Sequence, residues 1–335
     1  MQKRTLGKTN LFVSLLGVGG IPLQRFDEKN ALDILRAALE NGVNFVDTAK
    51  AYTKSEALIG YALEKLGRDN FFIASKSKSR DYASMKNDIL TSLEALRTDH
   101  IELYQCHCVA SDEEIEKIFS EDGAYKALLE AKAEGKISHI GFSAHKPEIA
   151  EKLIKTDKFD TVQYAYNYIE VKGKEVFELA KQHGMGTIVM KPMCGGAVRN
   201  RELSLRYIAK CEYVDVMIPG VDDDKQLLQN VSYVEKAEIP FTDEELSLIN
   251  KEVELLGHNF CRKCDYCQPC PNQINISNVL MLDGYYTRYD LKDWAKDRYD
   301  DSVERCVECG ECETRCPYEL PIREMLKAAH ERMKH

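Results

Sequence analysis

Cysteine spacing near the carboxyl end is the clearest chemical signal in this sequence. Eight of the 12 cysteines lie between Cys261 and Cys316. The second half of this set, starting at Cys306, reads C-x2-C-x2-C-x3-C-P, a spacing that wraps cubane 4Fe-4S clusters. The first half is one residue tighter before its last cysteine and also ends in Cys-Pro. We therefore expect two 4Fe-4S clusters, with zinc as the alternative because paired C-x2-C motifs also bind that ion.

The same spacing predicts which thiolates share a cluster. Three cysteines at x2 spacing can reach one cubane from a short loop, while the fourth, beyond the proline turn, points to the other cluster. The first triplet and the most distant cysteine would then hold one cluster: Cys261, Cys264, Cys267 and Cys316. The second triplet and the remaining cysteine would hold the other: Cys306, Cys309, Cys312 and Cys270.

Four polar residues associated with consecutive apolar runs form a second candidate site. Asp47 ends the second run and Tyr52 follows it, while Lys76 ends the third and His107 the fourth. If these runs are neighbouring parallel strands, about 4.8 Å apart, their ends meet at one pocket. An ammonium stabilises a nearby phenolate, and a carboxylate keeps that ammonium charged. Tyr52 would then be the acid/base, tuned by Lys76 and Asp47. His107 would hydrogen-bond the substrate oxygen.

The apolar runs that carry these groups predict a closed barrel. They cover residues 13–18, 44–48, 71–75, 101–107, 137–143, 161–166, 187–190 and 214–218. They recur about every 29 residues, with segments of helical periodicity such as 31–39 and 89–96 between them, which matches a (β/α)8 TIM barrel. A doubly wound open sheet is the alternative, although no G-x-G-x-x-G turn follows the first run.

The composition changes at Gly257 and predicts two domains. A helix is expected at Asp243–Leu256, because Thr242 and Glu245 have the spacing of a capping box. The barrel would occupy residues 1–256. Residues 257–335 would form a small α+β ferredoxin-like iron-sulfur domain.

The charge balance disfavours two kinds of partner. The chain has 46 Lys and Arg against 55 Asp and Glu, a net charge of -9, whereas nucleic acids and anionic membrane surfaces select basic proteins. No apolar stretch approaches the ~18 residues of a membrane span. Because the N-terminal residues also do not run into an apolar segment of secretory length, we expect a cytoplasmic protein. In that reducing compartment, closely spaced cysteines are better interpreted as metal or cluster ligands than as disulfides.

Residues 2–256 resemble the aldo-keto reductase superfamily. The resemblance rests on Arg4-Thr5-Leu6-Gly7-Lys8-Thr9, Asn44-Phe45-Val46-Asp47-Thr48-Ala49, Ser55-Glu56, Ile59-Gly60, Gly141-Phe142-Ser143 and Ile218-Pro219-Gly220. Asp47, Tyr52, Lys76 and His107 match its catalytic tetrad. The resemblance implies hydride transfer between a nicotinamide and a carbonyl carbon, with Tyr52 handling the proton. The whole chain resembles the subgroup that is fused to a bacterial-type two-cluster ferredoxin domain.

The resemblance also implies contacts to a nicotinamide dinucleotide. The candidate contacts are Gly19, Gly20, Ser143, Gln163, Met190, Lys191, Gly220, Gln226 and Asn230. Met190 stands where members usually carry a stacking tyrosine, so the aromatic stack is missing. Gly220 and Gln226 replace the Lys and Arg that grip a 2'-phosphate. The intervening carboxylates at 222–224 would repel that phosphate, so we expect NADH rather than NADPH.

Three functions follow from these features. The leading one is a carbonyl or alcohol oxidoreductase whose clusters exchange electrons with a ferredoxin or other carrier. Hydride transfer moves two electrons and a cubane moves one, so a flavin would reconcile the two, although the sequence carries no flavin signature. The second is a conventional NAD(P)H-dependent reductase with structural clusters. The third is an electron-transfer or binding protein with an idle barrel, which the complete tetrad disfavours.

Overall fold

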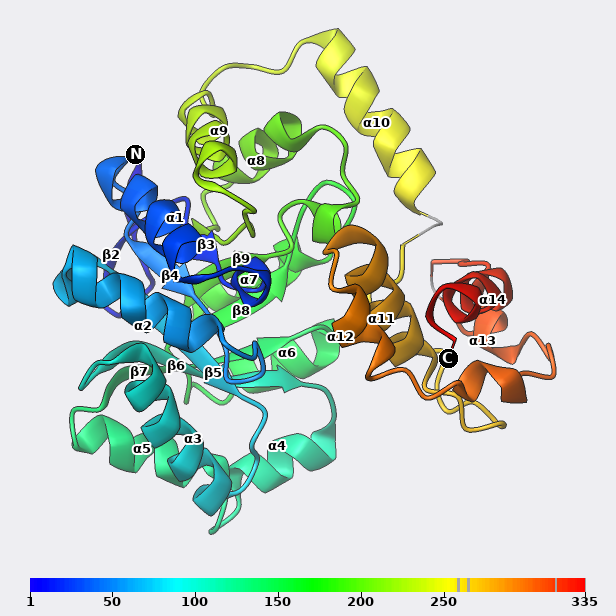
Figure 1. The fold of residues 1–335 in the computed structure, drawn as a ribbon, viewed down its shortest axis with the longest axis horizontal. Helices are drawn as coiled ribbons and strands as arrows, with labels where there is room; N and C mark the ends of the chain where they lie inside the picture. Colours follow the sequence, from blue (N-terminus) through cyan, green and yellow to red (C-terminus); the bar gives the residue numbers. More distant parts are fainter. Residues whose placement is uncertain (258–259, 264–265, 317, 335) are drawn as a thin grey trace. The chain divides into compact units, whose positions relative to one another are not determined.

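The computed structural model describes residues 1–257, 260–263, 266–316 and 318–334 (Figure 1). The chain divides into two compact units. Unit 1 comprises Met1–Met193 and Asn200–Pro240, and unit 2 comprises Cys194–Arg199 and Phe241–His335. The predicted helix at the end of the barrel domain, α10 (Asp243–Gly257), belongs to unit 2 in this division.

Unit 1 is built on an eight-stranded parallel sheet whose strands follow one another in chain order. The strands are β3 (Val18–Gly19), β4 (Phe45–Asp47), β5 (Phe72–Ser77), β6 (Ile101–Val109), β7 (Ile137–Ala144), β8 (Thr161–Ala165), β9 (Gly186–Met190) and β10 (Val216–Met217). The two edges are joined. Gly17 N donates to Met217 O over 2.8 Å and Gly19 N to Pro219 O over 2.9 Å. The closed (β/α)8 barrel expected from the apolar runs is therefore confirmed.

Helices lie between the strands, as a parallel sheet requires. They are α1 (Glu28–Glu40), α2 (Ser55–Leu66), α3 (Tyr82–Leu96), α4 (Asp112–Phe119), α5 (Ala124–Ala133), α6 (Pro147–Ile154), α7 (Gly173–Gln182), α8 (Arg201–Ala209) and α9 (Asp224–Glu235), with short 3-10 turns η1 (Pro22–Arg25) and η2 (Arg68–Asn70). Several of these helices have a side-chain N-cap, which accepts a hydrogen bond from the backbone N–H of the third helical residue. Among the caps are Asp27 for α1, Asp81 for α3 and Ser111 for α4. One apolar core lies between sheet and helices, and a smaller one fills the barrel.

The amino-terminal run differs from the expectation. Residues 13–18 were predicted as one strand, but β1 (Lys3–Thr5) and β2 (Phe12–Ser14) form an antiparallel hairpin, and the barrel strand β3 starts at Val18. Leu6 and Val13 of this hairpin contribute to the core inside the barrel. The end of β2 and the start of β3 both lie in the apolar run at residues 13–18. The periodicity of this run alone could not separate a hairpin strand from a barrel strand.

Unit 2 is helical in the part that the structure describes, whereas an α+β module was expected. Besides α10 it contains η3 (Cys194–Gly196), α11 (Ile276–Arg288), α12 (Lys292–Lys296), η4 (Ser302–Arg305), α13 (Glu311–Thr314) and α14 (Ile322–Met333). The predicted capping box of α10 is confirmed: Thr242 N donates to Glu245 Oε2 over 3.0 Å, and Glu245 N to Thr242 Oγ1 over 3.2 Å. Within the described ranges, every helix is too short or too polar to cross a bilayer.

Candidate active site and cluster site

A buried ion pair lies at the carboxyl ends of β4 and β5. Lys76 Nζ lies 2.8 Å and 2.7 Å from the two carboxylate oxygens of Asp47 and donates to Thr48 O over 2.6 Å. Both side chains are almost fully buried. Burial raises the pKa of Asp47, while the Lys76 ammonium opposes that rise. The three contacts hold the ammonium group in one position.

Tyr52 and His107 stand beside this ion pair. Tyr52 lies in the loop after β4, and Lys76 Nζ is 5.1 Å from the centre of its ring. The Tyr52 and His107 rings meet edge to face, with centres 5.9 Å apart and planes at 87°. All four residues predicted to form the tetrad are therefore brought together by three neighbouring strand ends.

His107 lies in a buried and positively charged environment. His107 is 7% exposed, and its pKa lies well below the ordinary value because of burial first and the basic side chains of Lys76, Lys78, His145 and Arg80 second. Nδ1 is buried and has no hydrogen-bond partner among the described residues. The ring is therefore neutral near pH 7, and a neutral imidazole keeps one N–H to donate.

Ser143 and Gln163, predicted to bind a carboxamide, already have partners in the protein. Ser143 Oγ accepts from Cys108 N over 2.8 Å, and Gln163 Oε1 accepts from Gln105 Nε2 over 3.0 Å. Both side chains are buried at the ends of β7 and β8. The Cys108 contact depends on a bulge in β6, where the register with β7 shifts between Cys106 and Val109.

Three glycines that were predicted to contact a cofactor are needed by the barrel itself. A Cβ on Gly19 would lie 2.6 Å from Ile218 O, and one on Gly20 would lie 2.6 Å from Asp47 O. A Cβ on Gly220 would lie 2.7 Å from Pro22 Cγ. Since real Cβ atoms do not approach so closely, packing within unit 1 accounts for a glycine at each of these positions.

Met190 and Lys191 follow one another at the end of β9. Met190 is half-buried, and Lys191 has φ +53, a left-handed conformation uncommon for a residue with a side chain. Asn167 Nδ2 donates to Lys191 O over 3.0 Å and holds this turn.

The carboxylates near Gln226 are less free than the sequence suggested. Asp222 forms an ion pair with Arg25 and accepts from Gln226 Nε2 over 3.1 Å. Asp223 caps α9 by accepting from Gln226 N over 2.7 Å. Asn230 is buried in the same helix. These partners weaken the electrostatic argument against a 2'-phosphate.

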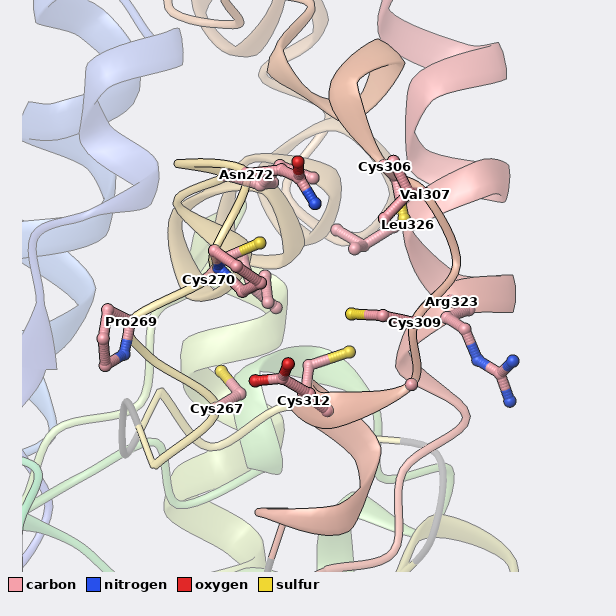
Figure 2. Close-up of a pocket in the computed structure, with 15 residues that line it drawn as sticks. Cys267, Pro269, Cys270, Asn272, Cys306, Val307, Cys309, Cys312, Arg323 and Leu326 are labelled. Carbon is pink, nitrogen blue, oxygen red and sulfur yellow. The ribbon is translucent and has the colours of Figure 1, made fainter.

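Five cysteines surround one space in unit 2 (Figure 2). They are Cys267, Cys270, Cys306, Cys309 and Cys312. The space measures about 380 Å³, part of which is open to solvent. All four cysteines that spacing assigned to the second cluster belong to this set. In Figure 2 the sulfur atoms of Cys270 and Cys309 point into the space from opposite sides.

The two cysteine segments are tied together by arginines. Arg305 Nη2 donates to Gln273 O over 2.8 Å, and Arg315 Nη1 donates to Pro269 O over 2.9 Å. A 4Fe-4S cubane takes four cysteine thiolates, and the four cysteines assigned to this cluster, together with Cys267, line this partly enclosed space.

The ligands predicted for the other cluster are described only in part. Cys264 lies outside the described residues. Cys261 and Cys316 are half-buried and pack against the core of unit 2, to which Cys267 belongs. Within the described ranges, no three His, Cys, Asp or Glu side chains are arranged to hold a single metal ion.

Comparisons with known proteins match both parts of the chain. The Aldo/keto reductase family matches residues 15–203, and a 4Fe-4S dicluster domain matches residues 260–321. Methylglyoxal reductase DkgB of Escherichia coli O157:H7 is 30% identical over 203 residues, which cover 57% of this chain and 72% of the relative. The NADH-specific methylglyoxal reductase of Escherichia coli (strain K12) is 25% identical over 224 residues, covering 58% and 68%.

A solved structure agrees with the barrel. Aldo-keto reductase AKR11C1 from Bacillus halodurans, in its holo form, superposes with a TM-score of 0.66 at 28% identity and covers 75% of this chain and 96% of that one. The family match spans more than half of the chain. The chain therefore belongs to the aldo/keto reductase family, as an oxidoreductase of carbonyl and alcohol groups that carries a 4Fe-4S dicluster domain.

Proposed function

We propose that the barrel interconverts a carbonyl and an alcohol through Asp47, Tyr52, Lys76 and His107. The observation that carries this proposal is the Lys76 ammonium, fixed by Asp47 and 5.1 Å from the Tyr52 ring. A fixed cation favours the phenolate over the phenol, which makes Tyr52 a stronger proton donor and brings its proton affinity closer to neutral pH.

His107 and Tyr52 would share the substrate oxygen. The neutral His107 ring donates a hydrogen bond to that oxygen and polarises the carbonyl, because burial and nearby cations keep the ring uncharged. Tyr52 then donates its proton to the same oxygen, and Lys76 stabilises the phenolate that remains. In the reverse direction Tyr52 accepts the alcohol proton.

In the nicotinamide-dependent reaction, the dinucleotide would supply or accept the hydride at the substrate carbon. In the cluster-driven reaction, the two clusters would supply the same two electrons one at a time, with one proton from Tyr52 and one from solvent. Ser143, Gln163, Met190 and Lys191 would lie nearest the nicotinamide ring, and Gln226 and Asn230 nearest the adenosine end of the dinucleotide. We propose NADH as the preferred form, since neither Gly220 nor Gln226 can pair with a 2'-phosphate. A flavin remains the alternative, because Met190 supplies no aromatic stack.

The clusters would be held in two sets. Cys270, Cys306, Cys309 and Cys312 would bind one, and Cys261, Cys264, Cys267 and Cys316 the other. We propose that they exchange single electrons with a ferredoxin or a similar carrier in a reducing, cytoplasmic compartment. The cysteines also pack against the small core of unit 2, an observation that favours structural clusters in a conventional reductase as the second candidate.

The test uses protein purified without oxygen and methylglyoxal as the carbonyl probe. Dithionite-reduced clusters, freed of dithionite, should be reoxidised by the probe without NADH, as followed by visible absorbance. If the reaction requires NADH and continues after both clusters are lost, the electron-exchange proposal is wrong and the protein is a conventional reductase.

The tetrad is tested by Tyr52→Phe, with Tyr61→Phe as its control. Tyr61 lies on α2 with Lys65 and Arg97 over its ring, so it carries the same neighbouring charge without the tetrad. Tyr52→Phe should lower turnover by roughly a hundredfold or more and leave cluster absorbance unchanged, whereas Tyr61→Phe should be active. Full activity of Tyr52→Phe would remove Tyr52 from the mechanism.

A further inference from the structure

A β-bulge shapes the strand that carries His107. Between Cys106 and Val109, β6 advances three residues while β7 advances two. Cys108 adopts φ +54 within the bulge. Because bulges re-aim side chains beside active sites, the main chain at this point determines where the imidazole ring lies.

Two side chains hold the bulge, one from β7 and one from the loop after β5. On the β7 side, Cys108 N donates to Ser143 Oγ over 2.8 Å. On the β5 side, Arg80 Nη2 donates to His107 O over 2.8 Å. Each contact satisfies a main-chain group that the interrupted ladder leaves without its regular partner.

Arg80 is itself held firmly. It is 8% exposed, and its Nη2 lies 3.1 Å from Glu114 Oε2, which also accepts from Ala110 N over 2.8 Å. Its own carbonyl accepts from Ala124 N over 2.9 Å. Nη2 therefore links the His107 carbonyl to Glu114, while Nε and Nη1 are buried without a hydrogen-bond partner among the described residues.

We propose that Arg80 is a positioning residue of the active site: it fixes the main chain of His107 and places a buried positive charge beside the imidazole. This inference rests on the proposed function, in which a neutral His107 donates to the substrate oxygen. The bulge contact gives Arg80 its place, and its charge disfavours a second positive charge on the ring.

Other groups also act on His107, and the experiment must separate them. The charged and titratable groups around the ring come from β4 and its loop, β5 and its loop, α4 and the loop after β7: Asp47, Tyr52, Lys76, Lys78, Arg80, Glu114 and His145. Among these groups, as far as the structure describes the chain, Arg80 alone combines a buried charge with a bond to the His107 main chain.

The test is an NMR titration of the His107 ring in the protein with its clusters, assigned by loss of its signal in His107→Gln. In the native protein the ring should stay neutral throughout the pH range in which the chain is folded. Arg80→Met should raise its pKa, so that the ring begins to take up a proton at the acidic end of that range. Arg80→Gln, which keeps a donor for the carbonyl, should raise it as well, and Arg80→Lys should restore the native behaviour.

Arg68→Met is the matched control. Arg68 forms the same kind of ion pair, with Glu102 over 2.9 Å, and donates to the carbonyl groups of Phe71 and His100, near the start of β6. It should leave the His107 titration unchanged. An unchanged titration in folded Arg80→Met and Arg80→Gln, or an equal shift in Arg68→Met, would overturn the inference. Because the titration needs no substrate, the expected shift in a protein that reduces no carbonyl would contradict the proposed function alone.

Discussion

At the scale of single residues, the Asp47–Lys76 pair should dominate the stability of the barrel mouth. Asp47→Asn would leave a buried ammonium without its counter-charge, which costs about 3–5 kcal/mol. Chemical denaturation followed by circular dichroism measures this loss. The double variant Asp47→Asn/Lys76→Met should recover part of it, and Asp33→Asn, which breaks the exposed pair with Lys29, should cause little change. Equal stability of Asp47→Asn and the native protein would contradict the buried-pair argument.

His107 should make the stability of the barrel depend on pH. Its folded-state pKa is well below the ordinary value. At mildly acidic pH, His107 therefore binds a proton in the unfolded chain but not in the folded chain. The free energy of unfolding should therefore fall as pH drops below about 6.5, by up to about 1.4 kcal/mol per pH unit. His107→Gln should remove this contribution, and His183→Gln, beside Asp157 on the outer surface, should keep it. The comparison requires denaturation series between pH 4 and 8. If the pH dependence of the free energy of unfolding is the same in His107→Gln as in the native protein, other groups cause it.

At the scale of elements, the sequence predicted the features that have a regular pattern or a fixed spacing. The strands of the barrel were found because near-continuous apolar runs are typical of a buried parallel sheet, and the α10 capping box because Thr242 and Glu245 bond each other directly. The β1–β2 hairpin was missed because its apolar pattern matches that of the adjoining barrel strand. The bulge at Cys108 was also missed, since a left-handed residue other than glycine leaves no mark in a sequence.

The candidate site was predictable for a similar reason. Asp47, Lys76 and His107 end successive strands, so topology alone brings them together. Arg80 lies beyond the end of β5, and its bond to the His107 carbonyl depends on the bulge. Partners such as Arg25 of Asp222 come from distant segments, and only a three-dimensional structure reveals them.

Helix α14 should determine how well the second cysteine segment retains its cluster. Arg323 Nη2 lies 2.7 Å from Glu313 Oε2, next to Cys312, and Lys327 lies 2.7 Å from Glu308, between Cys306 and Cys309. In Figure 2 the Arg323 guanidinium points away from the space between the cysteines, so its part is to hold the segment from behind. Arg323→Met should lower the iron content per chain and speed the loss of visible absorbance in the presence of a chelator.

Arg332→Met provides the comparison within the same helix. Arg332 pairs with Asp283 over 2.7 Å, away from the cysteine segment. This variant should retain iron as the native protein does. Equal retention by the two variants would show that the Arg323–Glu313 pair does not support the site.

At the scale of the whole molecule, the chain joins two kinds of electron chemistry. The barrel handles electron pairs, because converting a carbonyl to an alcohol takes two electrons and two protons. Each cubane handles one electron, so two reduced clusters hold the equivalent of one hydride. If the clusters serve the barrel, the number of electrons that two clusters hold equals the number that one carbonyl reduction needs. Clusters with a purely structural role would not need this equality.

A single-turnover experiment distinguishes these possibilities. Protein with both clusters reduced, freed of dithionite and given methylglyoxal without NADH, should form about one alcohol per chain, since the two electrons and two solvent protons complete one reduction. Cys309→Ala, expected to keep only the cluster of the other cysteine set, should form about half as much or less, because one electron per chain completes a reduction only when two chains contribute. Chromatography measures the alcohol formed, and electron paramagnetic resonance measures the electrons that the clusters have lost. Alcohol that forms only when NADH is added, in equal amounts in both proteins, would assign the clusters a structural role and leave the barrel to act as a nicotinamide-dependent reductase.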